Sequence, residues 1–65
     1  MNVYRVQFEI EEVYTEKKTN IYKWIGQTRF FKTETKEEAE EIFNDKYEGR
    51  NVRNVVIDLF EEGVN

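Results

Sequence analysis

The chain has 65 residues, of which 10 are basic and 14 acidic, and it contains no cysteine, histidine or proline. So short a chain buries only about 60% of the surface that it exposes when unfolded, which predicts one thin core and a single domain over residues 1–65. Without these residue types, disulfides, thiolate or histidine catalysis and cysteine- or histidine-ligated metals are excluded, and we expect a non-enzymatic protein without a cofactor.

The first predicted element is a strand over residues 3–14. Its side chains alternate between an apolar face, Tyr4, Val6, Phe8 and Ile10, and a polar face, Arg5, Gln7, Glu9 and Glu11. A period of two is typical of a strand that buries one face. The six residues that follow, 15–20, include no apolar side chain and predict a turn.

A second strand is predicted from Ile21 to about Thr33, where branched and aromatic residues dominate. The alternation is broken around Gly26. Either Gly26 is a bulge that resets the register, or Gly26 and Gln27 form the two-residue loop of a separate hairpin. We favour the bulge.

A helix follows, and its start has a capping signal. Thr35 and Glu38 fit a capping box, in which the Thr35 hydroxyl bonds the first free amides and the Glu38 carboxylate reaches back. Gly49 is a suitable left-handed stop. The apolar residues that recur at helical spacing, and are expected to face the core, are Ala39, Ile42, Phe43 and Tyr47.

The last predicted strand runs from Val52 to Glu61 and completes a ββαβ order. A right-handed crossover places this third strand beside the first, so we predict an α+β fold with an antiparallel sheet of order 2-1-3 and the helix on one face. The helix would cover the apolar face of strand one together with Val55, Ile57 and Leu59. The other face would then expose Val13, Val56, Phe60 and at least one aromatic residue of strand two.

The chain shows no hydrophobic segment for a membrane. Its longest apolar run is Val55-Val56-Ile57, and the first five residues lack the hydrophobic region of a signal peptide. We therefore expect a soluble, cytoplasmic protein.

Charge is unevenly distributed, because residues 17–33 carry only basic charges whereas residues 34–49 sum to −5. The basic residues of the second strand alternate with aromatic ones, as in proteins that bind single-stranded nucleic acid. Alternatively, these cations pair across the hairpin with Glu9, Glu11 and Glu12, and the net charge of −4 opposes phosphate binding. The candidate nucleic-acid residues are Lys17, Lys18, Lys23, Arg29 and Lys32.

The helix carries six acids, which could dock on a basic surface of a partner. Alternatively, they form a solvated face, and those in the first turn interact favourably with the helix dipole. Two further carboxylate clusters lack the spacing of a calcium loop, and we expect no metal site. These clusters are Glu9, Glu11 and Glu12, and Asp58, Glu61 and Glu62.

An uncovered apolar sheet face on a small domain is a candidate interface for another protein or for a second copy in a homodimer. Aromatic and arginine side chains dominate interface energetics, so they are the expected anchors, whereas helix acids would set orientation and association rate. The candidate anchors are Tyr22, Trp24, Arg29, Phe31, Val56 and Phe60, and the steering acids are Glu37, Glu41 and Glu48.

The segment from Phe30 to Leu59 resembles the pattern of the archaeal-type ribosomal protein LX family. The likeness lies in Phe30-Phe31-Lys32 in a strand, Glu37-Glu38-Ala39 opening the helix, Gly49 closing it and a returning strand. It covers about half of the chain and implies the same ββαβ fold. That family is basic and binds ribosomal RNA, from which the acidic helix here departs.

In length, acidity and richness in lysine and glutamate, the chain is similar to small accessory proteins of bacteriophages, many of which disable a host protein. This resemblance implies a protein-binding inhibitor that acts by steric or electrostatic blockade of a host protein. The alternative is a single-stranded nucleic-acid-binding domain that uses the basic second strand.

Overall fold

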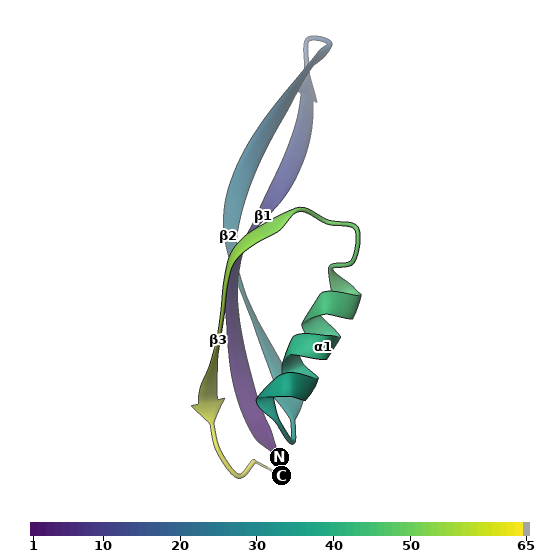
Figure 1. Ribbon diagram of the computed structural model, residues 1–65. Helices are drawn as coiled ribbons and strands as arrows, with labels where there is room; N and C mark the ends of the chain where they lie inside the picture. Colours follow the sequence, from purple (N-terminus) through teal and green to yellow (C-terminus); the bar gives the residue numbers. More distant parts are fainter. Residues whose placement is uncertain (65) are drawn as a thin grey trace.

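The computed structural model describes residues 1–64 and contains β1 (Asn2–Glu16), β2 (Thr19–Thr33), α1 (Lys36–Lys46) and β3 (Val52–Glu61). The three strands form an antiparallel sheet of order β2-β1-β3, and α1 lies on one face of it (Figure 1). The predicted α+β fold and strand order are confirmed. No helix in the described residues is long and apolar enough to cross a membrane.

The core lies between the central strand β1 and α1. The apolar face of β1 is buried as predicted, and Phe8 packs edge-on against Phe43 with ring centroids 4.9 Å apart. Tyr47 closes the cluster from the end of the helix. Ile42, which was expected in the core, is 44% exposed, because the helix buries a single stripe at four-residue spacing formed by Ala39, Phe43 and Tyr47.

Thr35 caps the helix as predicted. Its hydroxyl oxygen accepts a hydrogen bond from the Glu38 amide at 3.2 Å, whereas its hydroxyl group lies 3.3 Å from the Glu38 carboxylate and donates to it. The Glu38 side chain therefore contacts the cap hydroxyl instead of the cap amide expected in a capping box. Gly49 has φ +79°, the left-handed conformation predicted for the chain reversal after the helix.

The β1–β2 ladder keeps one register from Asn2 opposite Thr33 to Glu16 opposite Thr19. Gly26 simply faces Glu9, so both the favoured bulge and the alternative hairpin at Gly26 were wrong. The apolar alternation of β2 is broken for a different reason. β2 is an edge strand, and its first half extends beyond the helix, where neither face is buried.

The predicted six-residue turn is also shorter than expected, because strand pairing continues to Glu16 and Thr19. Only Lys17 and Lys18 form the loop, with φ of 49° and 66°. Positive φ at both central residues is the backbone of a type I′ turn, which matches the twist of a hairpin but favours Asn-Gly.

The bulges of the sheet lie in β3 instead, with register shifts opposite Val3/Tyr4 and Gln7/Glu9. Val52 and Ile57 are five residues apart, so an unbroken strand would point them to opposite faces of the sheet. The bulge between them, where Asn54 has φ +53°, brings both side chains against the core. Asparagine tolerates this conformation better than most residues.

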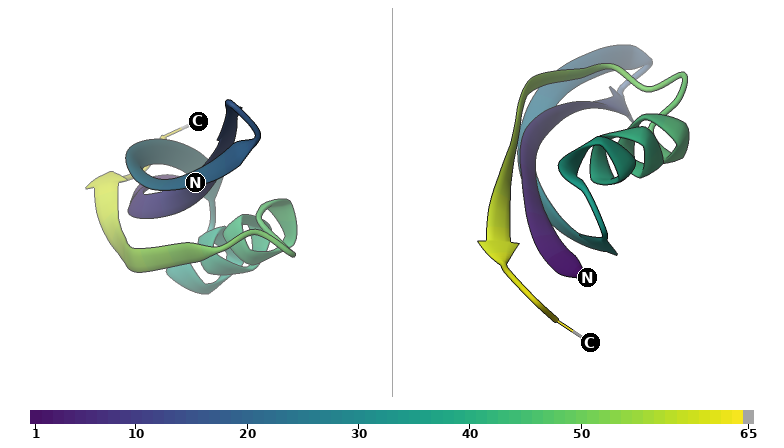
Figure 2. Two further views of the ribbon diagram at one scale, coloured as in Figure 1. Left: turned by 90° about the horizontal axis from the view of Figure 1, so that it is seen from above. Right: turned by 60° about the horizontal axis from the view of Figure 1, so that its bottom comes forward.

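The molecule is elongated, with extents of 50 × 18 × 18 Å. Pairing between β1 and β3 stops at Ile10 opposite Val52, and beyond it β1 and β2 continue as a twisted two-stranded arm, residues 11–24 (Figures 1 and 2). The arm exposes apolar side chains from both of its faces, namely Val13, Tyr14, Ile21 and Tyr22.

We predict that Phe8→Ala lowers the free energy of unfolding by about 3–5 kcal/mol, because it leaves a cavity between β1 and α1. Chemical denaturation measures the loss. The matched control is Phe30→Ala, an aromatic truncation at a side chain that is 52% exposed, which should cost about 1 kcal/mol. Equal losses in the two variants would contradict this account of the core.

We also predict that replacing Lys17-Lys18 by Asn-Gly stabilises the arm, because it relieves the cost of positive φ at two lysines. Amide hydrogen exchange of residues 12–16 and 19–23 should slow about 5- to 30-fold. Exchange in the β1–β3 pairs should change less. Unchanged exchange in the arm would show that the turn does not limit its stability.

Candidate protein-binding face

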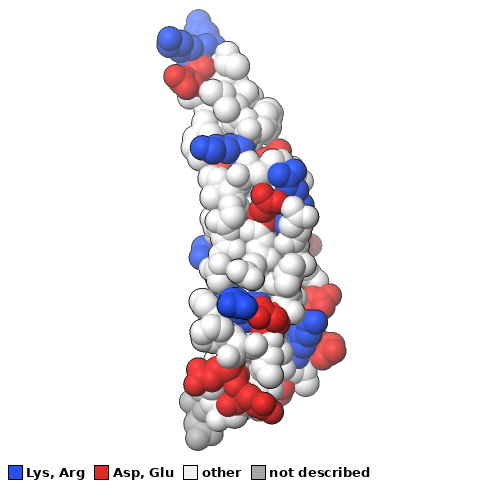
Figure 3. Space-filling model, turned by 90° about the vertical axis from the view of Figure 1, so that its left-hand side faces the viewer, with Lys and Arg blue, Asp and Glu red and all other residues white. Residues whose placement is uncertain are grey.

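The sheet face opposite α1 carries the candidate site and is called the open face (Figure 3). In the observed register, alternate residues of the three strands share this face. β1 contributes Val3, Arg5, Gln7, Glu9, Glu11 and Val13; β2 contributes Tyr22, Trp24, Gly26, Thr28, Phe30 and Lys32; and β3 contributes Arg53, Val56, Asp58, Phe60 and Glu61.

One cluster of the open face is built around Arg5. Its guanidinium donates to both carboxylate oxygens of Asp58, at 3.2 and 2.6 Å, and lies 5.8 Å from the ring centroid of Phe60. Phe60 in turn meets Phe30 edge-on at 4.8 Å. A bidentate ion pair holds the arginine in one orientation. The two half-exposed rings are therefore fixed in place on the surface.

A second cluster lies nearer the arm. The Arg53 guanidinium sits 4.1 Å from the ring centroid of Trp24 and donates to the Glu9 carboxylate at 3.1 Å. The Asn54 amide donates to the same carboxylate oxygen. The β3 bulge thus delivers two neighbouring side chains to one carboxylate. Arg53 also covers Trp24, which is only partly exposed.

Beside the second cluster the face is slightly hollowed, and Glu9 and Asn54 of that cluster line the hollow. Val56 is 56% exposed, and a shallow hollow of about 310 Å³ lies over the middle of β1. Gly26 lines this hollow, and a Cβ placed on it would meet no atom within 4 Å. The absent side chain thus leaves room for a group from outside the chain.

Four of the predicted anchors, Tyr22, Trp24, Val56 and Phe60, occur together on the open face. The structure does not bring the other two there. Phe31 pairs with Tyr4 and packs against the core from the helix side, and Arg29 pairs with Val6 and donates to the Tyr47 hydroxyl at 3.1 Å.

Sequence reasoning missed three functional residues of this face. Arg5, Phe30 and Arg53 were not among the anchors, although Arg5 follows directly from the alternation of β1. Phe30 was passed over for its neighbour Phe31, and the unbroken β1–β2 register places Phe30 opposite Arg5 on the open face. Arg53 depends on the β3 bulge, for which Asn54 was the one sequence signal.

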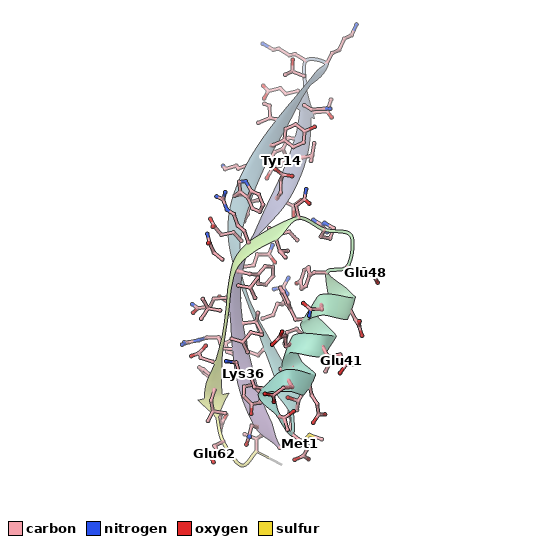
Figure 4. The ribbon with its side chains drawn as sticks, in the orientation of Figure 1. Met1, Tyr14, Lys36, Glu41, Glu48 and Glu62 are labelled. Carbon is pink, nitrogen blue, oxygen red and sulfur yellow. The ribbon has the colours of Figure 1, made fainter. Side chains whose placement is uncertain are left out.

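The predicted basic stripe is divided by the structure. Lys17 and Lys18 form the tip of the arm, Lys23 and Arg29 lie on the helix side of the ladder, and Lys32 lies on the open side. Strand alternation separates these cations, since neighbouring positions point to opposite faces. The acids Glu37, Glu41 and Glu48 are exposed on α1, and Glu41 and Glu48 point away from the sheet (Figure 4).

The acids of β1 find their partners in the segment after the helix. Glu9 pairs with Arg53, and Glu12 with Arg50 at 3.4 Å. Among residues 1–64, no salt bridge joins these acids to the basic residues of β2, and no cluster of three metal-ligating side chains occurs. The cross-hairpin pairing that we considered as an alternative was therefore wrong, because the cations come from Arg50 in the loop after α1 and from Arg53 in β3.

Comparisons of this chain with protein-family models, with curated proteins and with solved structures gave no match.

The two anchoring carboxylates predict an acid-dependent stability. The hydrogen bond from Arg5 lowers the pKa of Asp58, and hydrogen bonds from Asn54 and Arg53 lower the pKa of Glu9. A lowered pKa in the folded state stabilises the protein above the pKa of the unfolded chain, and this contribution is lost as the pH falls below about 4. Asp58→Asn and Glu9→Gln should therefore flatten the acid limb of the stability profile.

Thermal unfolding between pH 7 and 2.5 measures this effect. The exposed helix residue Asp45 provides the control, and Asp45→Asn should keep the acid limb of the parent protein. An unchanged limb in Asp58→Asn and Glu9→Gln would contradict the role of these carboxylates.

Proposed function

We propose that this protein is a small non-enzymatic binding module that occupies a surface of another protein through its open face. One observation carries the proposal. The face presents three half-exposed apolar side chains, Phe30, Val56 and Phe60. Phe60 contacts Phe30 and lies against Arg5, which is paired with Asp58. Clustered exposed apolar groups mark interaction sites on small soluble domains.

The anchors suit a preorganised interface. Aromatic and arginine side chains contribute most to binding when they are central and well packed. Arg5 and Arg53 already contact both a carboxylate and an aromatic ring, so few rotamers are lost on binding. The bound module would act as a steric block on the surface that it covers.

Charge supports a basic partner. The net charge is −4, and the acids of α1 lie on the side of the molecule away from the open face. From that position they would act on encounter through the long-range field and not through contact. The similarity in size and acidity to phage accessory proteins supports a cytoplasmic host protein as the target.

The test is capture of partners from a lysate of the source organism, with and without nuclease. Val56→Glu places a charge in the centre of the open face and should abolish capture. The matched control is Ile42→Glu, which puts the same charge on an apolar helix side chain that is 44% exposed, and it should retain capture. Circular dichroism checks that both variants fold.

Two outcomes would contradict the proposal. Equal capture by Val56→Glu and the parent protein would exclude the open face as the interface. Capture that nuclease removes, and that Lys23→Glu weakens, would instead favour the single-stranded nucleic-acid alternative. Such binding should also fall steeply between about 50 and 200 mM salt.

Replacing acids of α1 by lysine tests whether these acids steer association or contact the partner directly. We predict that Glu37→Lys, Glu41→Lys and Glu48→Lys together slow association and weaken its salt dependence, with little change in dissociation rate. Trp24→Ala should raise the dissociation rate, and the binding free energy should weaken by about 2–4 kcal/mol. Surface kinetics with the captured partner measures both, and a triple reversal that abolishes binding would make the helix the interface.

A further inference from the structure

We propose that a second copy of this chain also occupies the open face, in an antiparallel dimer with its two-fold axis near Gly26. The dimer rests on the proposed function of the open face, and it would regulate partner binding by that face. A dimer built on that face covers the residues that a partner needs, so self-association and partner binding compete.

The dimensions of the molecule set an upper limit on the dimer interface. The molecule measures 50 Å by 18 Å, so one face covers at most about 900 Å², and it is narrower along the two-stranded arm. A specific interface buries about 800 Å² of each partner. Phe30, Val56, Phe60, Tyr22 and Val13 are each more than half exposed, and they are distributed along the whole length of this face.

The charges at the two ends select the antiparallel arrangement. Lys17 and Lys18 form the tip of the arm beside Glu16, whereas Glu34, Glu61 and Glu62 lie at the opposite end beside Lys32, so lysines outnumber acids at the tip and acids outnumber lysines at the base. Figure 3 shows basic side chains with one acidic group at the arm end, a cluster of acidic side chains at the base, and both basic and acidic groups between them. Antiparallel copies bring opposite charges together, and parallel copies would bring like charges together.

The β1–β2 register gives the position of the two-fold axis of the dimer. Gly26 opposite Glu9 is the midpoint of the β1–β2 ladder, with Tyr22 four residues towards the tip and Phe30 four residues towards the base. A two-fold axis at the midpoint sets Tyr22 of one copy near Phe30 of the other, and it brings the lysine tip to the acidic base. The hollow at Gly26 is where the two sheets would approach most closely.

Sedimentation of the whole chain at low salt tests the dimer, which we expect at high micromolar concentration and expect Val56→Glu to abolish. Reversal of the tip, Lys17→Glu with Lys18→Glu, should weaken the dimer about 10-fold. Reversal of the base, Glu61→Lys with Glu62→Lys, should weaken it similarly, although it brings the net charge from −4 to zero. The four substitutions together should restore the parent affinity.

The charge pattern makes the outcomes distinct. A general repulsion between acidic chains would make the base reversal tighter, and a parallel dimer would leave both reversals unchanged, so either result overturns the antiparallel arrangement. Glu40→Lys with Glu41→Lys on α1 is the matched control and should not weaken the dimer. A strict monomer at every concentration overturns the dimer but leaves the proposed partner-binding function standing. The two are distinguishable because partner capture by Val56→Glu is measured in a separate experiment.

Discussion

The structure depends on a mismatch in length between its central strand, β1, and the helix α1 that covers it. β1 has 15 residues and spans roughly 50 Å, whereas α1 has 11 residues and spans roughly 16 Å. One helix can therefore cover only part of one face. The buried apolar core is confined to that part, formed by Tyr4, Val6, Phe8 and Ile10 against Ala39 and Phe43. The arm and the open face are what the helix leaves uncovered.

Two aromatic side chains of the open face contact arginines that are themselves ion-paired. Each aromatic cluster is fixed by an arginine that also bonds a carboxylate on a neighbouring strand, Arg5 with Asp58 and Arg53 with Glu9. Exposed ion pairs of this kind add little to stability. Their value lies in orientation, because they fix rings that would otherwise sample several rotamers in water. A surface prepared in this way is suited to binding.

The β3 bulge affects both the core and the open face. It lets Val52 and Ile57 both reach the core although their spacing is odd, and it turns Asn54 into the left-handed conformation from which its amide reaches Glu9. One local irregularity therefore serves packing on one face and the arginine cluster on the other. Charge also differs between the two ends of the long axis, with lysines at the arm tip and acids at the base.

The sequence by itself determined the element order, the apolar face of β1, the Thr35 cap and the sheet order, because local periodicity and the handedness of the crossover specify them. Tertiary structure alone decided the register of β2 and β3, since the first half of β2 has both faces in water and the bulges of β3 interrupt its alternation. It therefore also decided that Phe30 and Arg53, and not Phe31 and Arg29, belong to the open face. A shift of one residue moves every side chain to the other face, and only pairing with β1 settles that choice.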